Sequence, residues 1–157
     1  MTASTATERL SQLGLTLPAV APPVAAYVPA VRTGNYVYTS GQLPFVDGKL
    51  QGTGKVGEGV APDEAAALAR TAALNALAAV ASVAGGLDAI ARIVKVTCFV
   101  ASAPVFTGQA QVANGASELL IEVLGEAGRH ARSAVGMAVL PLDSPVEVEL
   151  IAEVAGA

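Results

Sequence analysis

The last quarter of the chain reads His130-Ala-Arg-Ser-Ala-Val-Gly-Met-Ala-Val-Leu-Pro-Leu-Asp-Ser-Pro-Val-Glu-Val-Glu-Leu-Ile-Ala-Glu-Val154. Two runs of small and β-branched residues, which favour strands, flank a turn bounded by Pro141 and Pro145. One charged residue lies near the start of each run, Arg132 in the first and Glu147 in the second. Charged side chains are seldom buried without a partner. Either these two reach solvent at a sheet edge, or they line a polar cleft.

The second run alternates with the period of a half-buried strand. Its glutamates Glu147, Glu149 and Glu153 share one face, and apolar residues occupy the other. A solvated glutamate face is the simplest interpretation of this pattern. Periodicity does not show that Arg132 and Glu147 approach each other, so both interpretations stay open.

The N-terminal segment predicts a helix followed by an extended arm. The helix spans Thr5–Gly14, because Thr5 and Glu8 fit a capping box and Gly14 fits a stop signal. Its apolar stripe consists of Leu10 and Leu13. Leu17–Pro23 contains three prolines and should be extended, as a docked arm. We therefore divide the chain into a helix and arm over residues 1–26 and one domain over residues 27–157.

The remaining chain predicts strands, a helix, a strand, a helix and two final strands. The expected early elements are a strand at Tyr27–Val31, a strand at Tyr36–Ser40 and a hairpin turn at Asp47-Gly48. The expected later elements are a helix at Pro62–Ala84, a strand at Ile90–Ala101 that is covered on both faces, and a helical region at Pro104–Leu124 that is irregular around Gly108 and Gly115. This order indicates an α+β fold with two helices packed on one face of one sheet.

The composition favours an oligomer and disfavours a nucleic-acid binder. Of 157 residues, 53% are hydrophobic and 14% are charged, which is apolar for a small soluble monomer and suggests burial against another subunit. The net charge is −4 without any run of Lys or Arg, whereas nucleic-acid binding relies on a basic face. The N-terminus lacks the pattern of a secretory signal, and residues 61–84 contain Asp63, Glu64, Arg70 and Asn75, which should be too polar for a membrane span. We expect a cytoplasmic protein.

Most enzyme templates do not fit the sequence. One cysteine, Cys98, and one histidine, His130, cannot make a zinc site of His and Cys ligands. Cys98 lies in an apolar run and should be a buried small hydrophobe. No Gly-x-Ser-x-Gly elbow is present, so a Ser–His–acid triad would have to use His130. In its Gly-rich surroundings, His130 fits an exposed loop residue better than a catalytic one.

Three separated stretches carry a resemblance to a known family. The first reads Tyr27-Val-Pro-Ala-Val-Arg-Thr-Gly-Asn-Tyr-Val-Tyr-Thr-Ser40-Gly-Gln-Leu-Pro44, and the second reads Val94-Lys-Val-Thr-Cys-Phe-Val100. The third combines, in this order, Ala131-Arg132-Ser133-Ala-Val, Leu140-Pro141 and Val146-Glu147-Val-Glu149. With these motifs, residues 27–154 resemble the RidA family, also called YjgF/YER057c/UK114.

The resemblance implies a chorismate-mutase-like α+β fold that assembles as a homotrimer with clefts between adjacent subunits. It implies hydrolysis of reactive enamines and imines, such as 2-aminoacrylate and other 2-imino acids, to 2-oxo acids and ammonia, without metal or cofactor. By the matched motifs, Arg132 would bind the substrate carboxylate, and Glu147 would position or activate water. The further cleft residues would be Tyr27, Ser40, Gly41 and Asn114.

Physical chemistry supports these two roles. A guanidinium binds a carboxylate through two parallel hydrogen bonds, which lysine cannot do. Hydrolysis of an imine needs both protonation and attack by water, and one positioned carboxyl can serve both steps. The alternatives are a non-catalytic member that binds small carboxylates or regulates a partner, and an endoribonuclease, against which the acidic charge counts.

The chain also departs from the family pattern. Residues 1–26 are longer than in compact members, and His130 occupies a position where proline is common. Phe106–Ser117 lacks the bulky aromatic residues that are often found there, which should reshape the pocket. The sequence thus resembles a divergent branch that keeps the carboxylate-binding arginine.

Overall fold

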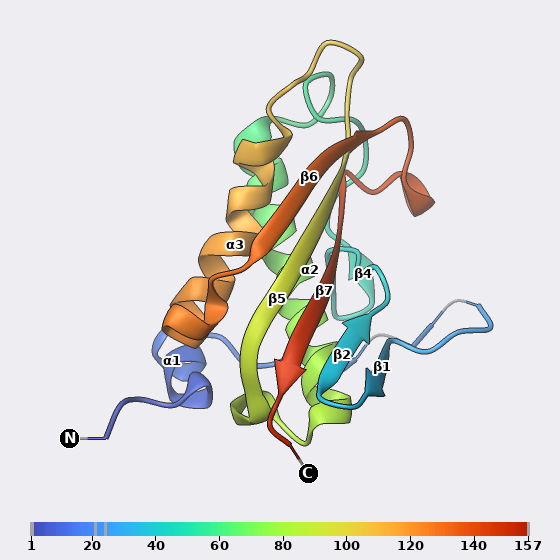
Figure 1. Cartoon of the computed structure of the whole chain (residues 1–157). Helices are drawn as coiled ribbons and strands as arrows, with labels where there is room; N and C mark the ends of the chain where they lie inside the picture. Colours follow the sequence, from blue (N-terminus) through green and yellow to red (C-terminus); the bar gives the residue numbers. More distant parts are fainter. Residues whose placement is uncertain (1, 21, 24, 157) are drawn as a thin grey trace.

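A computed structural model of the chain describes residues 2–20, 22–23 and 25–156, which form one sheet, one hairpin and the helices around them (Figure 1). The α-helices in these residues are α1 (Ala6–Gln12), α2 (Pro62–Ala84) and α3 (Gln109–Leu124). The strands are β1 (Ala30–Thr33), β2 (Tyr36–Thr39), β3 (Phe45–Val46), β4 (Lys49–Leu50), β5 (Ile90–Ala101), β6 (Ala131–Met137) and β7 (Val146–Val154). Short 3-10 helices lie at Leu87–Ala89, Gly125–Gly128 and Pro141–Asp143.

The main sheet has the strand order β1-β2-β7-β5-β6. Its two final strands, β6 and β7, lie on either side of β5. The β5–β6 pair is parallel, because α3 carries the chain back to the start of the sheet, and the other pairs are antiparallel. Helices α2 and α3 pack on one face, as predicted, and the opposite face is called the open face below (Figure 1).

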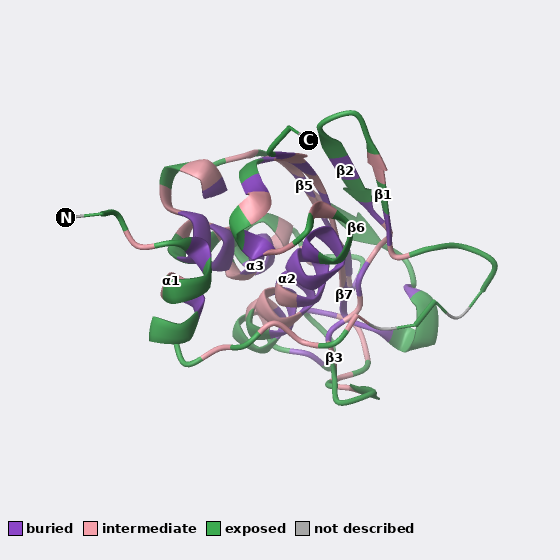
Figure 2. Cartoon of the chain, turned by 90° about the horizontal axis from the view of Figure 1, so that it is seen from below, coloured by how far each residue is buried: buried purple, intermediate pink, exposed green. Residues whose placement is uncertain are grey.

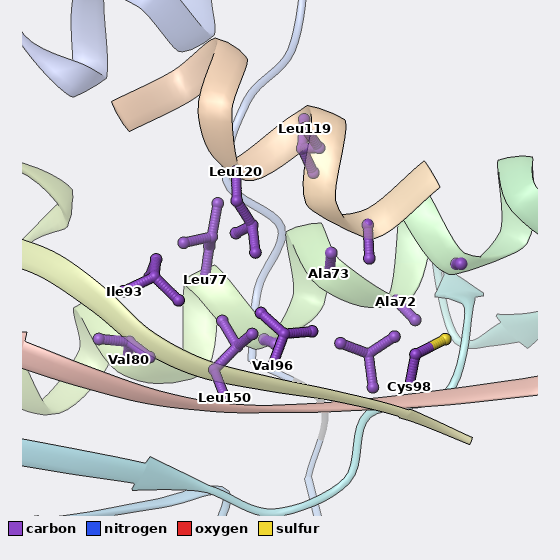
Figure 3. Packing of buried hydrophobic residues seen from close by; sticks show 14 of the residues in the cluster. Ala72, Ala73, Leu77, Val80, Ile93, Val96, Cys98, Leu119, Leu120 and Leu150 are labelled. Carbon is purple, nitrogen blue, oxygen red and sulfur yellow. The ribbon is translucent and has the colours of Figure 1, made fainter. Parts of the chain in front are cut away.

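The core lies between that sheet and the two helices. Alternate residues of β7, beginning with Val146, are buried against the helices, while Glu147, Glu149 and Glu153 are half-buried on the open face. Leu77 of α2 meets Val96 and Leu150 of the sheet in this layer (Figure 3). Each such fully buried side chain stabilises the fold by about 1.5–3 kcal/mol relative to exposure. The predicted alternation of the last strand is therefore confirmed.

Helix α2 is buried on more than one side, since it packs against the sheet and against its neighbour α3 (Figure 2). The side of the helix that carries Asn75 is covered as well. Asn75 is buried and its amide donates to the carbonyls of Leu43 and Phe45, both at 3.0 Å, which anchors the β3–β4 hairpin. The helix ends at Gly85 in the left-handed conformation, as the sequence indicates.

The membrane argument made from the sequence was too strong. By length and composition α2 is apolar enough to cross a membrane, with a mean hydropathy of 1.5 over its best window. However, 56% of that window is buried inside the molecule. Burial against a sheet and a second helix is the arrangement of a core helix, and this observation, rather than a few polar residues, accounts for its apolar sequence.

Gly115 does not break α3. The helix runs through it without interruption, and a Cβ built at this position would lie 1.9 Å from the backbone oxygen of Ala66 in α2. The glycine therefore permits the close crossing of the two helices. Gly108, in contrast, is the residue directly before the helix, so the expected irregularity marks its start.

The N-terminal helix forms as predicted, with both hydrogen bonds of its capping box. It docks on α3, where the Arg9 guanidinium donates to the carbonyl of Val123 at 2.7 Å. Its buried residues are Ala6 and Leu10, whereas Leu13 is exposed, so half of the predicted apolar stripe was wrong. Leu13 does not continue the buried stripe, because α1 ends at Gln12 and Leu13 lies outside the face of the helix that packs on α3.

Two predictions about strands need correction. The first strand begins at Ala30 rather than Tyr27, because Pro29 has no N–H to donate to a strand ladder and the chain before it turns instead. Strand β5 was expected to be covered on both faces. Within this chain only its helix side is fully buried, and Thr97 and Phe99 on the open face are half-buried.

Candidate active site

Glu147 lies near the start of β7 on the open face. Together with Tyr27 and Gly41 it lines a pocket of about 370 Å³. The apolar wall of this pocket comes from the N-terminal arm, the loop after β2 and the turn before β7, through residues that include Pro22, Pro23, Pro29, Leu43, Phe45 and Leu142. Three of the predicted site residues therefore meet in one cavity. The arm contributes to it as well.

The Glu147 carboxyl occupies space that only a glycine at position 41 leaves open. A Cβ built at Gly41 would lie 1.9 Å from Oε1 of Glu147. Burial raises the pKa of Glu147, and repulsion from the neighbouring Glu149 carboxylate raises it further. A half-buried carboxyl with a raised pKa is suited to accept and return protons.

The turn beside this pocket is held in an unusual conformation. Leu142 and Asp143 both have positive φ angles, 59° and 58°, which cost free energy for residues other than glycine. Asp143 forms an ion pair with Lys55, and its carbonyl accepts from the Gly54 N–H at 2.9 Å. These two contacts fix Leu142 at the rim of the pocket.

Arg132 lies on the opposite side of the sheet, at the junction of β6 and α3. Its Nη1 donates to Asn114 Oδ1 at 2.8 Å and to Ser117 Oγ at 3.1 Å, and its Nη2 donates to the Ala110 carbonyl at 3.3 Å. All three acceptors are neutral oxygens, and no described residue forms an ion pair with the guanidinium. Its charge is therefore left for an external anion.

The hydrogen bonds of Arg132 also leave two of its N–H donors without a partner among the described residues. The group has five N–H bonds, and three of them are used. Among the described residues, none accepts from Nε, and one N–H of Nη2 is unused. Nε and Nη2 are the donor atoms of the edge through which a guanidinium binds both oxygens of a carboxylate.

Ser117 and His130 extend this cluster. Ser117 Oγ lies 2.9 Å from Nε2 of His130, and Nδ1 of His130 lies 2.6 Å from the Gly128 carbonyl. Both side chains line a shallow depression together with Arg129, Arg132 and Ile121. Burial lowers the pKa of His130 and the nearby Arg132 adds to this, while the hydrogen bond to Gly128 acts in the opposite direction.

The two clusters do not meet within one chain. In the sheet register, Arg132 pairs with Val96 of β5, and Val96 faces the helices. Glu147 pairs with Phe99, which faces the open side. Tyr27, Gly41 and Glu147 thus form one group, and Asn114 and Arg132 form another. The strand register places them on opposite faces of the sheet.

The remaining predicted residues have structural positions. The Ser40 hydroxyl donates to the Val28 carbonyl at 2.7 Å, so it holds the chain before β1 in place beside Gly41. Cys98 is buried, and burial raises the pKa of its thiol to about 12, so it stays a thiol. Among the described residues, no cluster of three or more His, Cys, Asp or Glu side chains could hold a metal ion.

Sequence reasoning missed Ser117 and undervalued His130. Ala110, Asn114 and Ser117 are spaced four and three residues apart, so they share one face of α3. That spacing was readable from the sequence, but nothing in the sequence showed that this face meets Arg132. His130 is half-buried and hydrogen-bonded at both ring nitrogens, so it is not an exposed loop residue.

Comparison with protein families agrees with this fold. The model of the family described as YjgF/chorismate mutase-like, putative endoribonuclease, matches residues 7–154. The chain belongs to this family. The match begins within α1 and includes the arm, so most of the N-terminal extension of this RidA-family protein is part of what the family model covers.

Close relatives span nearly the whole chain. Protein TCP17 of Trypanosoma cruzi is 45% identical over 145 residues, which are 92% of this chain and 91% of that protein. The crystal structure of Atu1372 from Agrobacterium tumefaciens, a protein of unknown function, is 49% identical with a TM-score of 0.88, covering 96% of this chain and 92% of that one. A structure described as a putative endoribonuclease from Shewanella oneidensis is 36% identical with a TM-score of 0.93, covering 96% and 100%.

Two other solved members of this comparison are more distant in structure. RidA from an Antarctic Psychrobacter is 32% identical with a TM-score of 0.59, covering 88% of this chain and 96% of that one. TdcF of Escherichia coli, solved with bound serine, is 27% identical with a TM-score of 0.62, covering 85% and 91%. The RidA-family protein described here therefore shares the fold of these members and is more similar to Atu1372 and the Shewanella protein, by TM-score and identity.

Proposed function

We propose that this protein hydrolyses 2-imino acids and their enamine forms, such as 2-aminoacrylate, to 2-oxo acids and ammonia. The observation that carries the proposal is the Arg132 guanidinium, whose hydrogen bonds all go to neutral oxygens and which keeps two N–H donors, that of Nε and one of Nη2, without a partner among the described residues. An uncompensated guanidinium with unused donors suits the carboxylate that every 2-imino acid carries. The bound serine of TdcF, also an amino acid with a carboxylate, supports a ligand of this size.

Glu147 supplies the proton transfers in this proposal. Its carboxylate accepts a proton from water as the water oxygen forms a bond to C2 of the protonated imine. The protonated carboxyl then returns that proton to the amino nitrogen of the tetrahedral intermediate. The C2–N bond then breaks while the C2 hydroxyl gives its proton to the Glu147 carboxylate, so C2 becomes the carbonyl carbon of the 2-oxo acid. The leaving ammonia takes this proton and departs as ammonium, which restores the Glu147 carboxylate. The reaction is a hydrolysis without redox change, and acid–base help of about 10²–10⁴-fold would make the slow spontaneous reaction useful.

The proposal includes a homotrimer with its sites between subunits. Arg132 and Glu147 lie on opposite faces of the sheet in one chain, so a single chain does not bring both to one substrate. A neighbouring subunit that packs on the open face would supply the second group. Tyr36 and Tyr38 on β2 and Val135 on β6 are exposed apolar side chains that such packing would cover.

A coupled assay tests the activity. An amino-acid oxidase generates the imine from a range of amino acids, and semicarbazide traps the imine that escapes hydrolysis. We expect the wild-type protein to reduce the trapped imine. Arg132→Ala should remove the effect, and Arg132→Lys should raise KM at least about tenfold, because lysine cannot bind the carboxylate through two donors.

Two experimental outcomes would favour a different function. If the wild type never exceeds buffer on any imine yet binds pyruvate through Arg132, the protein is a carboxylate-binding or regulatory member. If purified protein cleaves RNA, and a cleft substitution such as Glu147→Gln abolishes that cleavage, an endoribonuclease activity is indicated. The net charge of −4 counts against the second outcome.

A further inference from the structure

We propose that Ser117 and His130 are positioning residues that hold the Arg132 guanidinium in the orientation that receives a carboxylate. This inference rests on the proposed role of Arg132 and extends it to two residues for which the family motifs give no role. It starts from the three consecutive contacts that connect Arg132, Ser117, His130 and the Gly128 carbonyl.

The direction of each hydrogen bond in this row follows from the last acceptor. A backbone carbonyl only accepts, so Nδ1 of His130 carries the proton that lies toward Gly128 at 2.6 Å. In the neutral ring, Nε2 is then the acceptor, and the Ser117 hydroxyl donates to it at 2.9 Å. The lone pairs of Ser117 Oγ are left to face the Arg132 Nη1 donor at 3.1 Å. Each group is thereby fixed by the next.

Close packing fixes the carbonyl at the end of the row. Gly128 is buried, and a Cβ at its position would lie 2.2 Å from the Leu120 backbone oxygen of α3. The 3-10 helix that contains Gly128 therefore rests directly on the helix that carries Ser117. Arg132 and the Gly128 carbonyl, the two ends of this series of hydrogen bonds, both contact α3, so the series does not depend on a mobile loop.

The arrangement requires a neutral imidazole. The charged groups next to His130 are Arg132 on β6 and Arg129 before it, and no described carboxylate lines this depression. Arg129 is paired with Glu126, whereas Arg132 has no ion-pair partner among the described residues, so the Arg132 cation opposes a second proton on the ring. Protonation would turn Nε2 into a donor, so the Ser117 hydroxyl would lose its acceptor and turn away. The neutral state keeps Ser117 available to Arg132.

The test compares variants by their affinity for pyruvate and by KM and kcat on an imine. Ser117→Ala and His130→Ala should each weaken pyruvate binding about tenfold, because each removes support from a hydrogen bond to a charged group. The double variant should lose no more pyruvate affinity than the weaker-binding of the two single variants, since the two residues act as one unit. Ser117→Thr keeps a hydroxyl and should stay within about twofold of wild type.

Matched controls separate positioning from general destabilisation. Ser82→Ala removes a helix serine whose hydroxyl donates to the Ala79 carbonyl in α2, and it should leave pyruvate affinity unchanged. Arg70→Ala removes the partner of Glu122 and lines no part of this depression, so it should change affinity by less than about twofold. KM should rise in the Ser117 and His130 variants while kcat falls less, since the two residues orient the carboxylate and do not handle the proton.

The single histidine makes a spectroscopic readout direct, because NMR of a histidine-labelled sample gives one imidazole signal set. We expect the Nδ1–H tautomer in the wild type and a changed Nε2 resonance in Ser117→Ala. Three results would each overturn the positioning role: an Nε2–H tautomer, additive effects on affinity in the double variant, or labelling of Ser117 by a fluorophosphonate, which would mark it as a nucleophile.

If Arg132→Ala loses pyruvate binding while Ser117→Ala does not, this inference alone fails. If the variants lose binding but no imine is hydrolysed, the proposed function alone fails.

Discussion

Glu147 combines three features that suit a proton-transfer group, namely partial burial, a like-charged neighbour and space provided by a glycine. Burial and then Glu149 raise its pKa. In the proposed reaction Glu147 must be ionised to accept a proton from water, so protonation of Glu147 stops the reaction. The rate should fall as pH decreases through the raised pKa, so the acid limb should lie above pH 4.5, the ordinary value for this group.

Glu149→Gln tests the second cause of that pKa shift. The substitution removes a negative charge near Glu147, so the pKa of Glu147 should fall and the acid limb of kcat should move to lower pH. The move should be small, because burial is the larger cause. Glu153→Gln, on the same face of β7 but further from Glu147 along the strand, should leave the pH dependence of kcat unchanged. An unchanged limb in Glu149→Gln would show that another group controls it.

Gly41→Ala tests the space around Glu147. The new methyl group would lie 1.9 Å from Oε1, so the carboxyl has to rotate away from its position. Misplacement by about 1 Å can reduce rate by up to about 10²-fold, and we expect kcat to fall while the melting temperature changes little. Gly59→Ala is the control, because a Cβ there meets nothing within 4 Å. Full activity in Gly41→Ala would remove Glu147 from the proposed site.

At the scale of elements, local sequence signals located most of the fold. Helix α2 has the predicted bounds because Pro62 starts it and Gly85 ends it. Strand β5 also has its predicted bounds, because its apolar run is continuous. Strand β1 was misplaced because Pro29 interrupts an otherwise suitable pattern. Gly115 was misjudged because its role is a contact with another helix, and local propensity carries no information about such contacts.

The candidate site was partly predictable for a related reason. The resemblance to the family identified Arg132, Glu147, Tyr27 and Gly41, which the structure places at two clusters. The separation of these clusters follows from the register between β5 and its two neighbours. Register depends on pairings across the sheet, so the sequence of one strand cannot give it. Ser117 was missed because a serine within a helix has no signal without its partner.

Gly115→Ala tests the contact between α2 and α3. In an isolated helix this change would be stabilising by up to about 1 kcal/mol, because alanine is the better helix former. Here the methyl group would collide with the Ala66 carbonyl, so the helices must separate, and we expect the free energy of unfolding to decrease by about 1–3 kcal/mol. Urea unfolding measures the difference. An increase in stability would contradict the close crossing.

At the scale of the molecule, an apolar composition and an uncovered sheet face both favour assembly. Tyr36, Tyr38, Val31 and Val135 are exposed in the single chain. We expect light scattering to give a mass of about three times 15.6 kDa. A monomer at micromolar concentration would contradict the proposed assembly, because a single chain leaves Arg132 and Glu147 apart.

Mixed assemblies test whether sites form between subunits. Arg132→Ala and Glu147→Gln should each be inactive alone. After the two variants are unfolded and refolded together, an interface between an intact Arg132 of one subunit and an intact Glu147 of its neighbour can form. Part of the activity should return, while mixing two preparations of the same variant should restore none. No recovery in verified mixed trimers would place both residues of one site on one subunit.

A crystal structure with a bound 2-oxo acid, such as pyruvate, tests the central claim most directly. We predict that the carboxylate binds Nε and Nη2 of Arg132, that Ser117 and Asn114 still hold Nη1, and that Glu147 of a neighbouring subunit lies within reach of C2. A carboxylate bound elsewhere, or a guanidinium directed to solvent with no Glu147 near the ligand, would contradict the account.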